Sequence, residues 1–189
     1  MSSHHIVREK QEPALLILGL ASFDDELLGQ LLEWSPTVIT TPDTAEQINA
    51  FGIKVDMMVA DEADIDLQSD VKLISQEAGS IVDAALDYLI SAGYSAVNIV
   101  ADEFTMEDIW GYADKINIVV FCEGRKVFAV TSGFSKWKPG GETIEILSAA
   151  TNLRTEGLEP AGDGKYTTIE DGFYALHFDG VFLFIAEEL

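Results

Sequence analysis

Apolar residues in the first part of the chain form short runs that alternate with longer stretches of helical period. Residues 14–20, ALLILGL, are apolar on both faces, which is typical of a central parallel strand covered by helices. Further short strands are predicted at residues 37–41, 55–59, 71–75 and 96–100. Apolar residues spaced three and four apart predict helices over residues 27–34, 42–51 and 82–90. This alternation predicts an α/β domain with a doubly wound, mostly parallel sheet over residues 12–113.

Local signals mark where these helices begin and end. Residues 24–26 are acidic and lie where a helix N-terminus favours negative charge. Thr41 and Pro42 combine a capping hydroxyl with a proline at the first helical position. Gly52 and Gly93 are expected to end their helices in the left-handed conformation.

From about residue 114 the apolar period changes from helical to alternating. Residues 116–120 and 127–131 alternate, and Glu123-Gly124 between them predicts a hairpin turn. Another strand is expected at residues 143–147.

The end of the chain carries a second turn signal. Residues 174–178 and 181–185 flank Asp179-Gly180, which predicts a two-residue hairpin between adjacent strands. No helical pattern interrupts this part of the chain. The sequence therefore predicts an all-β sandwich domain over residues 114–189.

An acidic segment follows the strand predicted at residues 55–59. The sequence DEADID places carboxylates at Asp61, Glu62, Asp64 and Asp66. Ligands of open α/β sheets bind beyond the carboxyl ends of the strands, and oxygen-rich clusters suit Mg²⁺ or Ca²⁺. The spacing by itself favours a simpler interpretation, a solvated acidic loop on an acidic protein. Both interpretations stay open at this point.

The charge of the chain restricts its partners. Its 189 residues have a formal net charge of −22, which argues against nucleic acid and anionic membranes. Between residues 11 and 114 the only basic side chains are Lys54 and Lys72, whereas bases return from Lys115 onward. A phosphate ligand would therefore need bridging cations or donors from elsewhere. Hydrophobic residues make up 48%, which supports a large core and excludes global disorder.

Cysteine usage and the terminal sequence predict a reducing, cytoplasmic compartment. The single Cys122 cannot form an intrachain disulfide, and its place in an apolar run predicts a buried, inert thiol. No apolar run approaches the roughly 20 residues of a membrane helix. The segment MSSHHIVREK lacks the apolar core of a signal peptide, and His4 and His5 in it are not expected to bind a metal.

Residues 38–61, VITTPDTAEQINAFGIKVDMMVAD, carry the most characteristic local pattern. Together with the element order and with residues 155–158, TEGL, this segment resembles the thiamine pyrophosphokinase family. Members carry the motifs DGGAN, Gly-Ile-x-Pro-Asp, GDFDS and Thr-x-Gly-Leu. The first three motifs keep some of their residues here, at Ala45, Gly52, Ile53, Asp56 and Asp61. The resemblance implies an α/β nucleotide domain, a β-sandwich and a homodimer.

Several motif residues of the family are replaced. The Asp and Asn of DGGAN fall on Pro42 and Glu46, and the second Asp of GDFDS falls on Ala63. An Asp-x-Thr-Asp motif falls on residues 78–81, AGSI, and a GGRxDH segment has no counterpart in residues 101–108. Each lost carboxylate removes a Mg²⁺ ligand, and the lost Arg removes charge that would stabilise the phosphates.

The resemblance also implies a set of site residues. Asp61 and its neighbour Asp64 are the expected catalytic and Mg²⁺-binding residues. The residues expected to bind ATP or thiamine are Asp43, Ala45, Asp56 and Asp83. Asp43 and Asp64 each stand one position, and Asp83 two positions, from a lost carboxylate. Asp43 and Asp64 replace their motif partners only if the loops are rebuilt, because a one-residue shift turns a side chain to the other face.

Candidate groups in the second domain are few. A base that neutralises phosphate could come from this domain or from a dimer partner, with Lys136, Trp137 and Lys138 as candidates. The simpler interpretation of these residues is a surface turn whose lysines extend into solvent. His177 lies within a predicted strand and is expected to be structural.

Three functional hypotheses follow. The first is a thiamine-pyrophosphokinase-like protein with a degenerate site, weak or no transfer from ATP to thiamine, and retained binding of thiamine, a nucleotide or a related ligand. The second is a divergent but active kinase that uses Mg²⁺ and ATP. The third is an interaction domain without catalytic activity.

Overall fold

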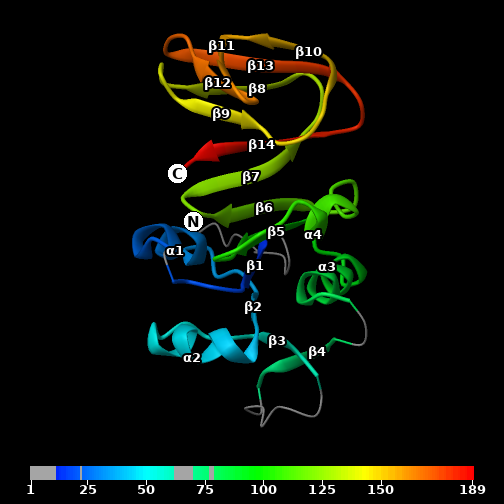
Figure 1. Cartoon of the computed structure of the whole chain (residues 1–189). Coiled ribbons are helices and arrows are strands. Elements are labelled where there is room, and N and C mark those ends of the chain that lie inside the picture. Colours follow the sequence, from blue (N-terminus) through cyan, green and yellow to red (C-terminus); the bar gives the residue numbers. More distant parts are fainter. Residues whose placement is uncertain (1–11, 22, 62–69, 77–78) are drawn as a thin grey trace, which may run out of the picture. The chain divides into compact units, whose positions relative to one another are not determined.

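The computed structural model describes residues 12–21, 23–61, 70–76 and 79–189, and the chain divides into two compact units after Ile118 (Figure 1). The first unit contains β1 (Ala14–Ile17), α1 (Asp25–Leu32), β2 (Val38–Thr40), α2 (Pro42–Ala50), β3 (Met57–Ala60), β4 (Lys72–Ser75), α3 (Ile81–Ser91), β5 (Ala96–Val100) and α4 (Glu107–Trp110). At the boundary and beyond lie β6 (Asn117–Cys122), β7 (Arg125–Val130), β8 (Phe134–Lys138), β9 (Thr143–Ile146), β10 (Thr151–Glu156), β11 (Leu158–Gly162), β12 (Lys165–Thr168), β13 (Gly172–Asp179) and β14 (Leu183–Glu188).

The strands of the first unit form a parallel arrangement in the order β4-β3-β2-β1-β5. β1 lies between β2 and β5, and all four of its residues are buried. Burial on both faces explains why ALLI shows no alternation of apolar and polar positions. The prediction of an α/β arrangement in this part of the chain is confirmed.

Helices lie on both sides of these strands. The chain steps from β1 to β4 in one direction and then returns to β5 beside β1. Because crossover connections between parallel strands are right-handed, the return passes over the opposite face of the sheet. Figure 1 accordingly shows α1 and α2 on one side of the strands and α3 on the other. The strand order reverses between β1 and β5.

The predicted helix ends are also found. Asp24 is the N-cap of α1, and its side chain accepts a hydrogen bond from the Leu27 backbone. Pro42 is the first residue of α2 and Thr41 is its N-cap, but the predicted capping hydroxyl is wrong, because the Thr41 hydroxyl bonds the Thr44 hydroxyl and makes no capping hydrogen bond. Gly52 and Gly93 follow α2 and α3 with φ values of 73° and 80°, the left-handed conformation that glycine adopts without strain.

The second unit consists of two groups of antiparallel strands. One has the order β11-β12-β9-β14-β7-β6, and the other is a three-stranded sheet in the order β10-β13-β8. Both contribute to one hydrophobic core, in which Tyr174 and Leu176 of β13 pack with Ile144, Leu183 and Ile185. Glu123 and Gly124 form the predicted turn between β6 and β7 and have positive φ values of 51° and 70°.

The predicted hairpin at Asp179-Gly180 is wrong. β13 pairs with β10 and β8, whereas β14 pairs with β7 and β9, so the chain passes from one sheet to the other here. A turn signal reports only local backbone preference, and the apolar faces of β13 and β14 are both needed on opposite sides of the core. Asp163-Gly164 forms the turn between β11 and β12 instead, with φ values of 49° and 78°.

Two smaller predictions concern the burial of Cys122 and the length of the helices. Cys122 is buried at the end of β6 and forms no disulfide, as predicted. None of the helices in the described ranges has the length and hydropathy needed to cross a bilayer.

Candidate ligand site at the carboxyl edge of the parallel strands

Parallel strands end at one edge, so the loops after β1 to β5 lie together. We call this the carboxyl edge, and its described residues are 18–21, Thr41, Asp61, Gln76 and 101–102. Open α/β sheets bind ligands in the crevice beyond this edge, where the strand order reverses. In this unit the reversal falls between β1 and β5, so the ligand position that the strand order predicts is near Gly19 and Asp102.

Asp102 packs directly against the loop that follows β1. Its Oδ1 accepts a hydrogen bond of 2.9 Å from the Ala21 backbone N–H. A Cβ atom added to Gly19 would lie only 2.2 Å from Asp102 Oδ2, so position 19 has no room for a side chain. The reversal point is therefore occupied by a carboxylate of the chain itself.

Threonine hydroxyls at the same edge tie α2 to β1. Thr40 donates from Oγ1 to the Ile17 carbonyl at 2.9 Å, and Thr44 donates to the Leu18 carbonyl at 3.2 Å. Thr41 and Thr44 also share a hydrogen bond of 3.1 Å. All three threonines are buried. Their hydroxyls stabilise the backbone and do not face a ligand.

Two of the three helix N-termini at this edge are capped by the protein's own side chains. Such termini ordinarily bind anions because their backbone N–H groups lack partners. Asp24 caps α1, and the Ser80–Asp83 capping box closes α3. α2 begins with Pro42, which has no N–H to donate, but its N-cap residue Thr41 makes no side-chain capping hydrogen bond. The termini of α1 and α3 therefore offer a phosphate fewer free donors than uncapped termini would.

Asp83 uses both carboxylate oxygens within the fold. Oδ2 accepts from the backbone N–H and the hydroxyl of Ser80 at 2.9 and 3.0 Å, and Oδ1 accepts from the Tyr112 hydroxyl at 3.0 Å. The backbone hydrogen bond from Ser80 is the main reason that the pKa of Asp83 is lowered, against an opposing effect of burial. Burial first, and then the hydrogen bond to Asp83, raises the pKa of Tyr112 to about 12.

Four of the predicted site residues share the carboxyl edge. Asp43 is exposed in the first turn of α2, Ala45 is buried one residue beyond Thr44, and Asp61 is exposed directly after β3. Asp83 follows β4 in the first turn of α3. Asp64 lies outside the described residues.

Asp56 lies at the opposite, amino edge of the strands. Its Oδ2 accepts a hydrogen bond from the Val38 N–H at 3.0 Å, and Lys54 pairs with its Oδ1 at 3.3 Å. The four residues of β3 separate it from Asp61, roughly 15 Å at about 3.3 Å per residue. Oxygens that share an ion lie about 2.0–2.6 Å from it, so these two carboxylates do not bind one metal. Asp56 instead lines a pocket of about 460 Å³ with residues 52–54 and the end of α1.

Three searches compared the chain with known proteins. No protein-family model and no curated protein matches the sequence. Solved structures do match the fold. Thiamine pyrophosphokinase from Bacillus subtilis has a TM-score of 0.65 and 12% identity over 93% of this chain and 98% of that chain. The Geobacillus thermodenitrificans enzyme gives a TM-score of 0.69 at 11% identity over 93% and 97%. The Candida albicans enzyme gives 0.62 at 13% over 94% and 90%.

The chain has the thiamine pyrophosphokinase fold. The resemblance that the sequence suggested is therefore confirmed for the backbone plan. Identities of 11–13% establish the fold alone. The chemistry has to be argued from the side chains that this chain carries on that fold.

Magnesium is the metal that the fold implies. Among the residues that the structure describes, no three His, Cys, Asp or Glu side chains gather as a metal site. Asp43 and Asp61 are exposed on this edge, and Asp83 is used in its helix cap. The described donors therefore do not form a Mg²⁺ site.

Three lysines lie in the described part of the first unit. Lys54 precedes β3 and pairs with Asp56, and Lys72 is the first residue of β4. Lys72 donates to the Tyr88 hydroxyl at 2.8 Å and lies over its ring. These two lysines are at the amino edge, whereas Lys115 follows α4 and lies over the Tyr112 ring, 5.2 Å from its centroid. The described residues that directly follow β1 to β5 include no lysine or arginine.

The lysines that sequence analysis offered as phosphate partners are occupied elsewhere. Lys136 and Lys138 lie on β8, so the expected surface turn is wrong. Lys136, Lys138 and Lys126 surround Glu187, with Nζ–Oε2 distances of 2.5, 3.7 and 3.6 Å, respectively. The Glu187 side chain is 1% exposed. The strand pattern was hidden by the adjacent Pro139, Gly140 and Gly141, which resemble turn residues. Trp137 points to the other face of β8 and is 52% exposed.

Glu187 remains ionised despite its burial. Burial alone would raise its pKa, but hydrogen bonds from Lys136 and from the Tyr174 hydroxyl, at 2.5 and 2.9 Å, outweigh it and lower the pKa. Burial and the Glu187 charge raise the pKa of Tyr174. Burial, followed by repulsion from Lys136, lowers the pKa of Lys126. Sequence analysis missed this group because its members come from separate strands.

Proposed function

We propose that this chain is a thiamine-pyrophosphokinase-like protein with a degenerate active site that transfers pyrophosphate weakly or not at all. One observation carries this proposal. The carboxyl edge, where the fold positions a ligand, has exposed carboxylates and side-chain caps on the N-termini of α1 and α3, and the described residues that directly follow its strands include no lysine or arginine. A bound triphosphate would therefore meet negative charge where it needs donors.

The physical argument rests on the demands of phosphoryl transfer. Catalysis of this reaction consists of positioning the phosphates and neutralising the charge that develops on them. An arginine or a pair of metal ions ordinarily supplies that neutralisation. Two like charges about 4 Å apart repel by about 4 kcal/mol at an effective dielectric constant of about 20. Without countercharges, the acidic edge disfavours ATP in both the ground and the transition state.

The remaining assignments complete the proposal. Residues 12–113 act as a doubly wound catalytic-type domain, and residues 114–189 act as a β-sandwich of the thiamine-binding type. The protein is a cytoplasmic homodimer that retains binding of thiamine, a nucleotide or a related small molecule. Light scattering at micromolar concentration tests the dimer, and a monomer mass contradicts it.

A direct assay tests the loss of activity. Purified protein is incubated with ATP, Mg²⁺ and thiamine, and AMP and thiamine diphosphate are quantified by chromatography. We expect no product above the enzyme-free control, together with calorimetric binding of thiamine or ATP. Absence of binding to either ligand would leave the interaction domain as the function.

An active but divergent kinase is the second candidate, because Asp43 and Asp61 share the carboxyl edge. With Asp64, they would hold Mg²⁺ and ATP for transfer to thiamine. Turnover that Asp61→Ala abolishes and Asp70→Ala retains would establish this candidate and overturn the degenerate site. Asp70 is the matched control because it is exposed before β4, at the amino edge.

A further inference from the structure

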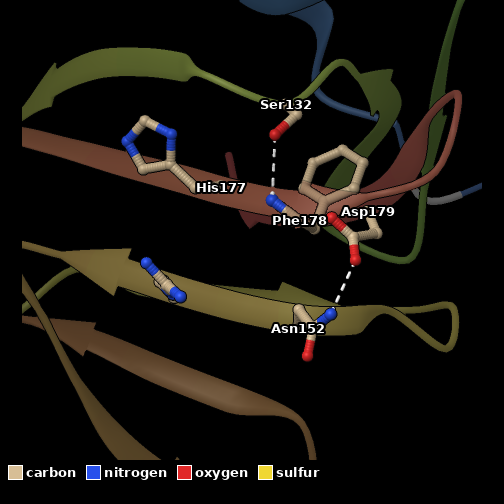
Figure 2. A pocket seen from close by; sticks show the side chains of 6 residues that line it. Ser132, Asn152, His177, Phe178 and Asp179 are labelled. Carbon is tan, nitrogen blue, oxygen red and sulfur yellow. Dashed lines mark hydrogen bonds between the residues drawn. The ribbon is translucent and has the colours of Figure 1, made fainter.

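A polar pocket of about 380 Å³ lies within the second unit (Figure 2). It is lined by Ser132, Asn152, Arg154, His177, Phe178 and Asp179. Small-molecule sites occupy about 300–1,000 Å³, so this pocket has the size of a site for a small ligand. No part of the function proposed above uses it.

The pairing of β10 with β13 builds this pocket. Arg154 lies opposite His177 in the antiparallel register, and Thr151 lies opposite Asp179. Between these pairs the register shifts, and Asn152 has a positive φ of 54°. This irregularity directs the Asn152 amide toward Asp179, where Nδ2 donates to Oδ2 at 2.6 Å (Figure 2).

Ser132 closes the other side of the pocket. Its Oγ accepts a hydrogen bond of 2.9 Å from the Phe178 backbone N–H (Figure 2). Because the oxygen accepts there, the hydroxyl hydrogen is left to donate. The His177 side chain is half-exposed and lies on the same face of β13 as Asp179. The pocket thus combines hydroxyl, amide, imidazole and guanidinium groups, all of which can donate to an anion.

Arg154 differs from most bases of this unit. Arg125 pairs with Glu123 and Glu145 at 2.8 and 3.1 Å. Lysines 126, 136 and 138 all surround Glu187. Arg154 has no carboxylate partner among the residues that the structure describes, although the chain has a net charge of −22. An unpaired arginine in a pocket of so acidic a protein is a candidate anion-binding group.

We propose that this pocket binds the phosphate group of a small molecule. The planar guanidinium of Arg154 presents paired N–H donors that match two phosphate oxygens. His177, directly opposite in the register, adds a second donor, which is cationic when protonated. Ser132 and the second amide hydrogen of Asn152 contribute neutral donors.

Two carboxylates weaken the site. Asp179 lines the pocket, although its Oδ2 is engaged by Asn152. Glu156 approaches His177 at 3.7 Å and is 73% exposed. The charged groups that face His177 are therefore Arg154 and Glu156 from β10 and Asp179 from β13, while the lysines of β8 face Glu187 instead. The positive and negative charges around the pocket nearly cancel, so we expect phosphate affinity to change with each single charge that is removed.

The test uses the full chain and inorganic phosphate as the probe. Phosphate replaces chloride at constant ionic strength, and NMR follows the imidazole resonance of His177. We expect a saturable shift that Arg154→Gln weakens at least about tenfold. Lys165→Gln is the matched control, because it removes the same charge from an exposed position on β12. It should leave affinity within about twofold.

A further variant separates the proposal from a non-specific charge effect. Asp179→Asn should tighten phosphate binding by removing the opposing carboxylate. Absence of a saturable shift, or equal losses in Arg154→Gln and Lys165→Gln, would overturn the proposal. A thermal melt confirms that each variant is folded.

Discussion

The two units of this chain handle charge in opposite ways. At the carboxyl edge of the first unit, the carboxylates of Asp83 and Asp102 accept hydrogen bonds from backbone N–H and hydroxyl groups. In the second unit, three lysines surround the buried Glu187, and Arg154 lines a pocket and has no ion pair with a carboxylate among the described residues. The described residues that directly follow the parallel strands include no lysine or arginine.

Under the proposed function, the fold is kept while the chemistry of the thiamine pyrophosphokinases is lost. Strand order and crossover direction depend on apolar positions and helix ends, which many sequences satisfy. Thiamine pyrophosphokinases therefore match 93–94% of the chain at 11–13% identity. Catalysis depends on a few charged side chains, whose replacement leaves the backbone plan intact. Side chains of the protein itself cap α1 and α3 of the first unit.

Removing the buried carboxylate of the second unit should have the largest effect on stability. Glu187→Gln leaves three lysines around a neutral amide, and breaking a buried ion pair costs about 3–5 kcal/mol. Amide hydrogen exchange in β8 and β14 measures the loss locally. Glu188→Gln, at the exposed neighbouring position, is the control and should change stability by less than about 0.5 kcal/mol. Equal protection in both variants would contradict a structural role for the lysine cluster.

The same group predicts a dependence on pH. The folded state lowers the pKa of Glu187 below its ordinary value of 4.5, so its contribution is fully present above that value. The contribution is lost as the pH falls through the lower, folded pKa. Wild-type protein should therefore lose more stability on acidification through this range than Glu187→Gln does. Parallel losses in both proteins would show that Glu187 is not the linked group.

A smaller effect is expected at the reversal point of the first unit. Gly19→Ala places a Cβ atom 2.2 Å from Asp102 Oδ2, and overpacking of this kind costs about 1–3 kcal/mol. Gly29→Ala is the matched control, because its Cβ meets nothing within 4 Å in helix α1. That change should stabilise by up to about 1 kcal/mol. Urea unfolding measures both, and Asp102→Gly should relieve the cost of Gly19→Ala if the contact is responsible.

Local signals explain why most of the fold could be predicted from the sequence. The uniformly apolar run of β1, the proline at the start of α2 and the glycines after α2 and α3 act within a few residues of themselves. The wrong hairpin at Asp179-Gly180 has the same origin. A local turn preference does not reveal that the next strand belongs to another sheet.

The site features depend on residues far apart in the chain. Asp102 reaches a backbone N–H 81 positions away, and Glu187 meets a lysine 51 positions away. Neither partner can be chosen until the strand order is known. The pocket at Arg154 and His177 was missed because β13 was paired with the wrong strand. Topology, rather than composition, therefore limited the prediction of function.

The smallest expected effect concerns Asp83, a predicted cofactor ligand whose oxygens are used in the fold. Asp83→Ala removes the capping box of α3 and should cost about 1 kcal/mol in urea unfolding. Asp25→Ala, an exposed first-turn carboxylate of α1, should cost about 0.3–1 kcal/mol at most.

The pKa of Tyr112, raised to about 12, should fall toward 10.0 in Asp83→Ala because it loses a hydrogen bond and a nearby charge. Absorbance titration of tyrosine measures that fall. An unchanged Tyr112 pKa would mean that burial alone raises it. Asp83 would then again be a candidate carboxylate for binding a ligand.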